Sequence, residues 1–211
     1  RSFALIRKAK RPVIIFGAGV KLAKAEQKAV EFAKRLQFPF VLTWATLDMF
    51  AYKDNLNAGG FGITSPRLGN FVVQNADLII AIGSRLDTHA VGSPFSSFAR
   101  EAKKIVLDID KNETGKFKRF GMAVDICINA NALDFFKIAN KKLKKIKTQD
   151  ISEWVKIVSG WKRKYPSCLP EYFHQKKGVN PYVFLEALSE ESSEGDVVIA
   201  DTGGNLAQTM Q

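Results

Sequence analysis

The sequence predicts an α/β protein in which a doubly wound, Rossmann-like parallel sheet lies between two layers of helices, in a three-layer α/β/α arrangement. The first observation is that apolar runs of strand length alternate with longer segments whose apolar residues recur at the helical period of about 3.6. The second is that several runs end in glycine or acidic residues, as strands do beside the ligand crevice of an open parallel sheet. The clearest example is 78–82, which leads directly into Gly83-Ser84-Arg85.

Composition and charge argue against several other classes of protein. Of the 211 residues, 46% are hydrophobic and 25% are charged, which is ordinary for a globular protein. No apolar run approaches the roughly 20 residues of a membrane-spanning helix. The formal net charge is +11, but six lysines lie in the acid-free stretch 137–147, which we interpret as a solvated helix end rather than a nucleic-acid-binding surface. Cys127 and Cys168 give neither a disulfide framework nor metal-ligand spacing, so a reducing cytoplasm is expected.

The first strand–turn–helix unit begins at 13–16, a strand candidate that ends in Gly17-Ala18-Gly19. Glycines allow a tight turn and a close approach to a ligand, and a helix amino end offers unpaired N–H groups to an anion. As a dinucleotide fingerprint the motif is incomplete, because Leu22 stands at the third glycine position and no acid follows the next strand at Thr43. A tight turn without a ligand therefore remains an alternative. Apolar residues at 22, 25, 29, 32, 33 and 36 predict the buried face of one helix.

The remaining elements of the sheet follow the same alternation. The stretch 54–62 is rich in turn residues and is assigned to a loop. Thr64 or Ser65 is expected to cap a helix with Pro66 at its first position. The expected strands are 13–16, 38–43, 78–82, 104–110 and 122–126, and further helices are expected at 93–100 and 130–146. This order predicts a parallel sheet with right-handed crossovers.

The pattern changes after residue 147, and we expect three parts: a central nucleotide-binding-like domain at 1–147, a linker with a connecting helix at 148–179, and the truncated start of another domain at 180–211. Asp150 and Glu153 resemble a capping box for the connecting helix. The last part begins with a helix at Asn180-Pro181 and continues into a buried-type strand at 197–200. Because the pattern stops at Gln211 within a strand–turn–helix unit, the chain is expected to be an excerpt of a longer protein. The connecting helix is expected to carry Trp154, Ile157, Val158 and Trp161 on one side.

With these residues in view, the chain resembles the acetolactate synthase group of thiamine diphosphate-dependent enzymes. Segments 11–19, 43–44, 74–87 and 107–110 resemble the central domain of that group, and 180–211 resembles the entry to its carboxyl-terminal, diphosphate-binding domain. The resemblance implies a parent enzyme that uses thiamine diphosphate and Mg²⁺. The reaction implied is decarboxylation of a 2-keto acid such as pyruvate and transfer of the resulting carbanion to an acceptor. A homodimer or homotetramer is expected for the full-length protein.

The resemblance also implies where cofactors bind. In the family the central domain holds FAD, which is structural in the reaction, while related domains hold ADP or no nucleotide. Backbone N–H groups and an arginine suit a diphosphate, and carboxylates suit hydroxyl groups. The positions that match the nucleotide site are Gly17, Ala18, Gly19, Thr43, Trp44, Gly62, Ile63, Thr64, Gly83, Ser84, Arg85, Asp87, Asp110 and Asp125. The positions that match the thiamine diphosphate site are Thr202, Gly203, Gly204 and Asn205.

No catalytic or metal-binding residue is assigned within the chain. In the family the activating glutamate lies in an amino-terminal domain and the magnesium-binding segment lies beyond the position of Gln211, so the 211 residues alone are expected to be inactive. Two alternatives follow from the residues themselves. Arg85 suits a surface position or a pair with Asp87 as well as a phosphate contact. The chain also suits a non-catalytic nucleotide-binding or assembly module that holds FAD or ADP.

Overall fold

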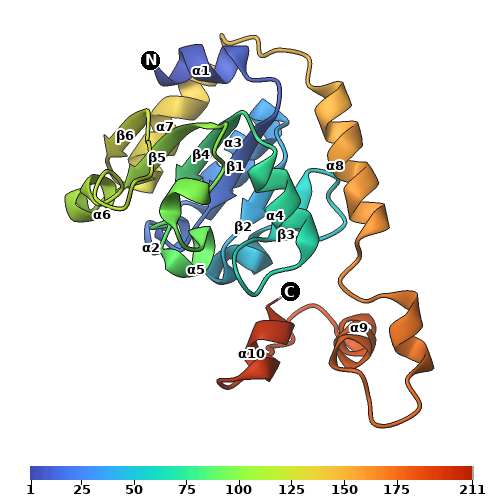
Figure 1. Cartoon of the computed structure of the whole chain (residues 1–211). Helices are drawn as coiled ribbons and strands as arrows, with labels where there is room; N and C mark the ends of the chain where they lie inside the picture. Colours follow the sequence, from blue (N-terminus) through green and yellow to red (C-terminus); the bar gives the residue numbers. More distant parts are fainter. Residues whose placement is uncertain (211) are drawn as a thin grey trace.

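The computed structural model describes residues 1–210, and in this part of the chain one six-stranded parallel sheet is flanked by helices (Figure 1). The strand order is β3-β2-β1-β4-β5-β6, so the chain order reverses between β1 and β4, and we call this place the switch point. The doubly wound fold class is confirmed. The strands are β1 Pro12–Phe16, β2 Phe40–Leu42, β3 Asn57–Gly60, β4 Leu78–Ile82, β5 Lys103–Asp108 and β6 Ile126–Asn129.

Helices cover both faces of the sheet. The pair α3 and α7 packs together on one face, and α4 lies over the other face beside β3 (Figure 1). The α-helices are α1 Ser2–Lys8, α2 Gly19–Leu22, α3 Glu26–Leu36, α4 Arg67–Gln74, α5 Thr88–Val91, α6 Lys111–Gly115, α7 Ala132–Leu143, α8 Ser152–Lys164, α9 Pro181–Glu191 and α10 Gly204–Thr209. The 3₁₀ segments are η1 Trp44–Met49, η2 Phe95–Ser97 and η3 Pro170–His174.

The hydrophobic core lies around the two central strands. All residues of β1 and β4 are buried, because each strand has neighbours on both sides and helices above and below. Between β1 and the α3–α7 pair, the Phe136 ring lies 6.4 Å from the Phe16 ring and 5.4 Å from the Phe32 ring. Such aromatic pairs add about 0.5–1.5 kcal/mol each beyond the burial of their area. The core therefore holds the carboxyl ends of the central strands in fixed positions.

Three of the expected elements differ near the amino end. The stretch assigned to a loop contains β3, whose sequence Asn-Ala-Gly-Gly lacks the branched and aromatic residues typical of strands. Its pairing with β2 decides its structure. The single expected helix is divided into α2 and α3, because the backbone is left-handed at Lys24, with φ of 51°, and Leu22 is 84% exposed instead of buried. The N-cap residue of α4 is Pro66, which makes no side-chain hydrogen bond. The helix therefore begins one residue later than expected, and neither Thr64 nor Ser65 is its N-cap residue.

The sixth strand was expected four residues too early. The strand is Ile126–Asn129, and residues 122–125 form the loop before it. Within β6, Ile126 and Ile128 point toward the protein while Cys127 and Asn129 are exposed. This alternation is typical of an edge strand with one covered face. Burial alternates in the same way over 122–125, but those residues are not paired with β5, whose partners begin at Ile126.

Beyond the sheet, α8 runs down one side of the body and carries the segment 166–210, which we call the arm (Figure 1). The expected capping box is wrong, because Ile151 occupies the N-cap position without a side-chain hydrogen bond. Asp150, one residue earlier, still accepts a hydrogen bond from Ser152 N through Oδ1 at 2.9 Å. Trp154 and Val158 are buried as expected, but Ile157 is 44% exposed. The expected strand at 197–200 is wrong, because this segment forms no strand and Val197 is 82% exposed. Among residues 1–210, no helix is both long and apolar enough to cross a membrane.

Candidate functional site at the carboxyl edge of the sheet

The loops that leave the carboxyl ends of the strands meet at one edge of the sheet. At the switch point, the loop after β1 donates two hydrogen bonds, from Gly17 N to Ile82 O in the last residue of β4 at 3.0 Å and from Gly19 N to Gly83 O in the loop that follows at 2.9 Å. We call this contact the glycine junction. A Cβ on Gly17 would lie 2.2 Å from Ser84 Cα, and Gly83 has a φ of +60°. The glycines are therefore required by the contact between the two loops, which agrees with the tight turn that the sequence analysis kept as an alternative to a ligand site.

A crevice of about 120 Å³ lies beside the glycine junction. Leu22 and Ile109 are 84% and 68% exposed there, so each offers an apolar surface to the crevice. Ligand pockets usually measure about 300–1,000 Å³, so this crevice suits one ring or sugar rather than a whole dinucleotide. Its lining residues are Gly19, Leu22, Ala23, Gly83, Leu107, Asp108, Ile109, Ala130, Asn131 and Ala132.

Arg85 lies on a strained part of the loop after β4. Arg85 and Leu86 have φ values of 60° and 47°, in the left-handed region that costs a non-glycine residue about 1–2 kcal/mol. Burial of the Leu86 side chain holds this conformation. Arg85 Nε contacts Glu113 Oε1 at 3.0 Å, so the alternative pair with Asp87 is wrong, and the Arg85 side chain remains 68% exposed.

Glu113 connects the arginine to a second cation. Lys116 Nζ donates to Glu113 Oε2 at 2.6 Å, and this hydrogen bond is the main cause of the lowered pKa of the Glu113 carboxyl. The carboxylate therefore neutralises only part of the positive charge of Arg85 and Lys116. Because a guanidinium has five N–H donors, Arg85 keeps donors for a further anion after bonding Glu113.

Two other predicted residues serve the local structure. Asp87 caps α5, since its Oδ1 accepts a hydrogen bond from Ala90 N at 3.1 Å. Asp110 caps α6 in the same way, through Asn112 N at 2.8 Å. Both carboxylates lie at the carboxyl edge, where a second acceptor site of each remains geometrically open to a ligand. Ser84 also lies at this edge, and its buried Oγ has no hydrogen-bond partner within residues 1–210.

The loops after β2, β3 and β4 form a second cluster. The rings of Trp44 and His89 meet edge to face with their centroids 5.2 Å apart. Ile63 N donates to His89 O at 3.0 Å, and a Cβ on Gly62 would lie 2.6 Å from the same oxygen. Thr64 follows in the same loop, and Thr43 N, at the end of β2, donates to Phe16 O at 3.0 Å. Of the predicted residues, Trp44, Gly62 and Ile63 are therefore brought together around His89, and the Ile63 side chain is 66% exposed. Thr43 and Thr64 are their chain neighbours.

Asp125 is placed at the opposite edge of the sheet, because it precedes β6 instead of ending it. Its Oδ2 accepts a hydrogen bond from Lys104 N at 2.9 Å, and its Oδ1 contacts Lys103 Nζ at 3.0 Å. Both lysines lie at the amino end of β5. The residues that follow β6 and reach the crevice are Ala130 and Asn131, which the sequence analysis missed. The alternation of 126–129 followed by asparagines was the signal that could have found them.

The arm carries Thr202, Gly203, Gly204 and Asn205. Gly203 has a φ of +101° and precedes α10, and Asn205 Oδ1 accepts a hydrogen bond from Leu206 N at 3.0 Å. The structure does not bring these residues to the crevice. Their helix lies below the body near the end of β3, and a Cβ on Gly60 would lie 3.7 Å from Met210 O (Figure 1).

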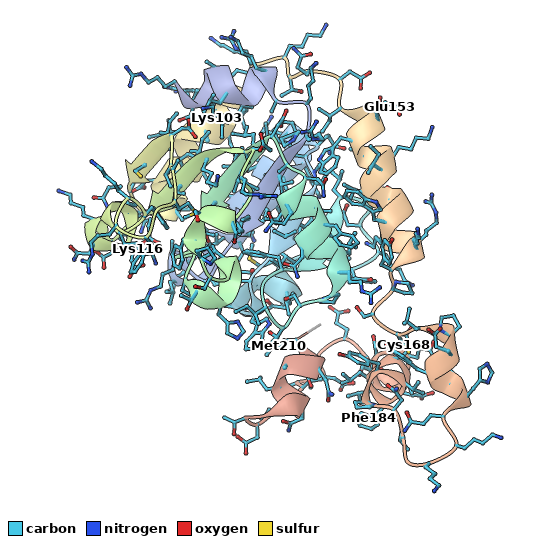
Figure 2. All side chains as sticks on the ribbon, viewed as in Figure 1. Lys103, Lys116, Glu153, Cys168, Phe184 and Met210 are labelled. Carbon is cyan, nitrogen blue, oxygen red and sulfur yellow. The ribbon has the colours of Figure 1, made fainter. Side chains whose placement is uncertain are left out.

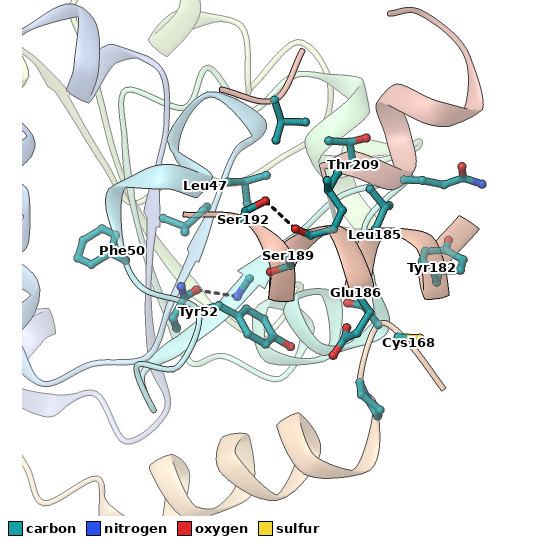
Figure 3. A pocket seen from close by; sticks show the side chains of 18 residues that line it. Leu47, Phe50, Tyr52, Cys168, Tyr182, Leu185, Glu186, Ser189, Ser192 and Thr209 are labelled. Carbon is teal, nitrogen blue, oxygen red and sulfur yellow. Dashed lines mark hydrogen bonds between the residues drawn. The ribbon is translucent and has the colours of Figure 1, made fainter. Parts of the chain in front are cut away.

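A larger cavity of about 600 Å³ lies between the body and the arm (Figure 3). Tyr52 belongs to the body, whereas Cys168, Tyr182 and Glu186 belong to the arm, whose separation from the body is visible in Figure 2. Burial raises the pKa of the Tyr52 hydroxyl, and the nearby Glu186 charge raises it further. Burial also raises the pKa of the Cys168 thiol. Both groups are therefore kept protonated, which makes them hydrogen-bond donors rather than nucleophiles.

Comparison with known proteins gives matches over the sheet and the arm. Residues 1–135 match the family model for the thiamine pyrophosphate enzyme, central domain. The chain is 29% identical over 211 residues to the acetolactate synthase isozyme 1 large subunit of Escherichia coli, covering 99% of this chain and 35% of that protein. It is 33% identical over 201 residues to the acetolactate synthase large subunit of Corynebacterium glutamicum, covering 94% and 31%. The mitochondrial acetolactate synthase catalytic subunit of Saccharomyces cerevisiae is 30% identical over 211 residues, with coverage of 94% and 29%. The chain thus spans about a third of the length of these curated relatives.

Proposed function

Because the chain belongs to the thiamine pyrophosphate enzymes, whose central domain its residues 1–135 match, we propose that it is part of an enzyme resembling the acetolactate synthase large subunit. The observation that carries this proposal is the extent of the similarity, which continues past residue 135 through α8 and the arm. The proposed reaction is decarboxylation of a 2-keto acid such as pyruvate and joining of the remaining carbon fragment to an acceptor. Thiamine diphosphate, held with Mg²⁺, supplies the carbanion chemistry of such a reaction when it is bound.

In this proposal the residues of the chain bind and position, and proton transfer belongs to other parts of the enzyme. Thr202, Gly203, Gly204 and Asn205 are the proposed contacts to the diphosphate. Gly203 supports this role because its positive φ turns the backbone immediately before α10, where N–H groups of the first turn are available to an anion.

The whole protein that contains this chain tests the proposed reaction. Purified enzyme with pyruvate, thiamine diphosphate and Mg²⁺ should release carbon dioxide and form acetolactate, and both products should depend on added thiamine diphosphate. A parallel series of other 2-keto acids defines the preferred substrate. An enzyme that turns over no 2-keto acid in the presence of the cofactor would contradict the proposal. The 211-residue chain is the matched control and is expected to be inactive.

A nucleotide, either FAD or ADP, is the proposed ligand of the crevice. The exposed surfaces of Leu22 and Ile109 suit the two faces of a flat ring, and Ser84 Oγ is a buried polar atom that lacks a partner within residues 1–210. Arg85 suits a phosphate group because its guanidinium is exposed at the same edge. The crevice, at about 120 Å³, holds only one part of the nucleotide. The other parts of the nucleotide are proposed to lie along the carboxyl edge of the sheet.

Thermal unfolding of the 211-residue chain with FAD, ADP or NAD tests this binding. Ligand at about 100 times its dissociation constant should add roughly 2.7 kcal/mol to the free energy of unfolding. Arg85→Ala should weaken binding by about 1.5–3 kcal/mol, because a charge-assisted hydrogen bond is lost. Arg100→Ala, which removes another exposed arginine, is the matched control and should leave binding unchanged. Absence of stabilisation by every nucleotide would refute a nucleotide site.

We propose the domain boundaries on the same basis, with 1–147 as the central domain, 148–179 as the connection and 180–211 as the start of the diphosphate-binding domain. Exposed apolar side chains on the arm support this division. Phe184 and Ile199 are 58% and 91% exposed, which is expected when a segment packs in a larger domain. Hydrogen exchange should show 197–200 unprotected in the 211-residue chain and protected in the whole protein. Equal exchange in the two proteins would contradict the boundary.

A homodimer or homotetramer in a reducing cytoplasm completes the proposal. Both cysteines are free, which agrees with a compartment that keeps thiols reduced. Mass measurement of the native whole protein tests the assembly, and a purely monomeric species would contradict it.

A further inference from the structure

Lys162 on α8 is held by three main-chain carbonyl oxygens from a single loop. Its Nζ donates hydrogen bonds to Tyr52 O, to Asp54 O at 2.9 Å and to Asn57 O at 3.0 Å. The same Nζ lies 4.4 Å from the centroid of the Tyr52 ring. We call this set of three oxygens and one ring the carbonyl cradle. It is an arrangement of neutral groups, and within residues 1–210 no carboxylate oxygen is bonded to the ammonium.

The cradle matches an ammonium ion in number and kind of partners. An ammonium on a lysine has three N–H donors and no acceptor, so three oxygens satisfy it completely. Carbonyl oxygens that converge on one point replace the hydration shell of a monovalent cation, as they do in potassium-selective channels. The face of the Tyr52 ring adds an attraction for positive charge. Burial lowers the pKa of Lys162, while the charge of Asp54 opposes this effect.

The loop holds its own shape through hydrogen bonds that do not involve the lysine. Asp54 N donates to Ala51 O at 3.1 Å, and Asn57 N donates to Asp54 O at 3.1 Å. Asp54 Oδ1 accepts from Leu56 N at 2.9 Å, and the Asn57 side chain donates to Ala51 O at 3.2 Å. The three carbonyls are therefore directed at one point by the fold of the loop itself.

We propose that the carbonyl cradle of loop 52–57 is a binding site for a monovalent ammonium-type cation, and that Lys162 occupies it as a tethered ligand. The position of the cradle gives this site a mechanical role. Tyr52 and Asn57 line the cavity of about 600 Å³, and α8 leads directly to Pro166 and Cys168, which line the same cavity from the arm. The bound cation thus ties the carboxyl-terminal half of α8, which leads into the arm, to loop 52–57 of the body.

Removal of the tether tests the site. Lys162→Ala leaves three converging carbonyls, of which only that of Asn57 belongs to a buried residue, without their partner. It should lower the midpoint of thermal unfolding, followed by tryptophan fluorescence, by about 2–4 °C. Ammonium or methylammonium chloride should restore part of that loss in Lys162→Ala and have no such effect on the unaltered chain. Sodium and tetramethylammonium chloride at the same concentration should not restore it, because sodium is too small for the cradle and tetramethylammonium has no N–H donor.

Two variants serve as controls. Lys162→Met keeps an unbranched stem without charge, so it should be destabilised like the alanine variant but should not respond to ammonium, because the stem blocks the cradle. Lys156→Ala removes an exposed lysine from the same helix and should leave the midpoint unchanged. If Lys162→Ala does not fold in buffer, its refolding yield in ammonium and in sodium gives the same comparison. Equal effects of all salts, or equal stability of the alanine variants at 156 and 162, would overturn the proposal.

Discussion

Replacing Gly17 by alanine tests whether the glycine junction is as tight as the structure indicates. The added Cβ would lie 2.2 Å from Ser84 Cα and 2.4 Å from Gly83 O. Both are backbone atoms, so no change of side-chain rotamer relieves the contact. Because non-bonded carbon atoms rest about 3.5–4.0 Å apart, one loop has to move by roughly 1 Å. The expected result is a large loss of stability from a single methyl group.

The size of the loss follows from two contributions. Forcing an extra carbon into a packed region costs about 1–3 kcal/mol. Movement of the loop also weakens the hydrogen bonds from Gly17 N to Ile82 O and from Gly19 N to Gly83 O, which measure 3.0 and 2.9 Å and contribute about 1 kcal/mol each. The free energy of unfolding should therefore fall by about 2–5 kcal/mol, a large part of the roughly 5–15 kcal/mol of an ordinary domain.

Urea unfolding followed by far-ultraviolet circular dichroism measures this change. Gly160→Ala is the matched control, because a Cβ at this position in α8 meets nothing within 4 Å. The control should stabilise the protein by roughly 0.5–1 kcal/mol, since alanine is the better helix residue. A Gly17→Ala variant that loses less than about 1 kcal/mol would show that the loops separate at little cost, and the tight junction would be refuted.

Three further predictions concern α8, α3 and the Glu113 cluster. Trp154→Phe should lower the free energy of unfolding by about 1–3 kcal/mol in urea, because it removes the 3.1 Å hydrogen bond to the main chain of β1 and leaves a buried gap. The pKa of Glu31 is lowered from 4.5 to about 2, and the largest cause is the hydrogen bond that its carboxylate accepts from Arg35. The stabilisation from the ionised carboxylate is therefore complete above pH 4.5 and is lost as the pH falls toward 2. Carbon-detected NMR titration measures this pKa. Lys116→Met should raise the pKa of Glu113 more than Arg85→Ala does, because the hydrogen bond from Lys116 is the larger cause of the lowered pKa. The same NMR titration compares the two variants. Equal pKa shifts would contradict the larger effect of Lys116.

The sequence predicted the elements whose structure depends on local pattern. The apolar runs of β1 and β4 are buried along their whole length, and the stripe at 29, 32, 33 and 36 is the buried face of α3, with the buried Ala25 at its N-cap. In contrast, β3 is a strand because Phe40 and Leu42 of β2 pair with Asn57 and Gly60. Its glycines carry no strand signal, so pairing across the sheet decides its structure.

The residues of the candidate site were predicted where they follow a strand whose position was right. Gly17, Gly83 and Arg85 lie at the carboxyl edge because β1 and β4 end where the apolar runs end. Asp125 was misplaced because the strand beside it begins four residues later than expected. Arg85 pairs with Glu113, 28 residues away, which no local pattern could indicate.

The glycine junction divides the carboxyl edge into two halves. This division allows an experiment to distinguish FAD from ADP as the bound nucleotide. The crevice with Leu22 and Ile109 lies on one side, and the Trp44–His89 pair lies on the other, with Arg85 after the junction itself. ADP that occupies the crevice and reaches Arg85 is not expected to contact Trp44. The longer FAD can continue past Arg85 to the rings of Trp44, which is partly buried, and His89, which is exposed, and there a flavin should quench Trp44 fluorescence. Quenching that disappears in Trp44→Phe would therefore identify FAD as the ligand that spans both halves, whereas stabilisation by either nucleotide without quenching would confine the ligand to the crevice.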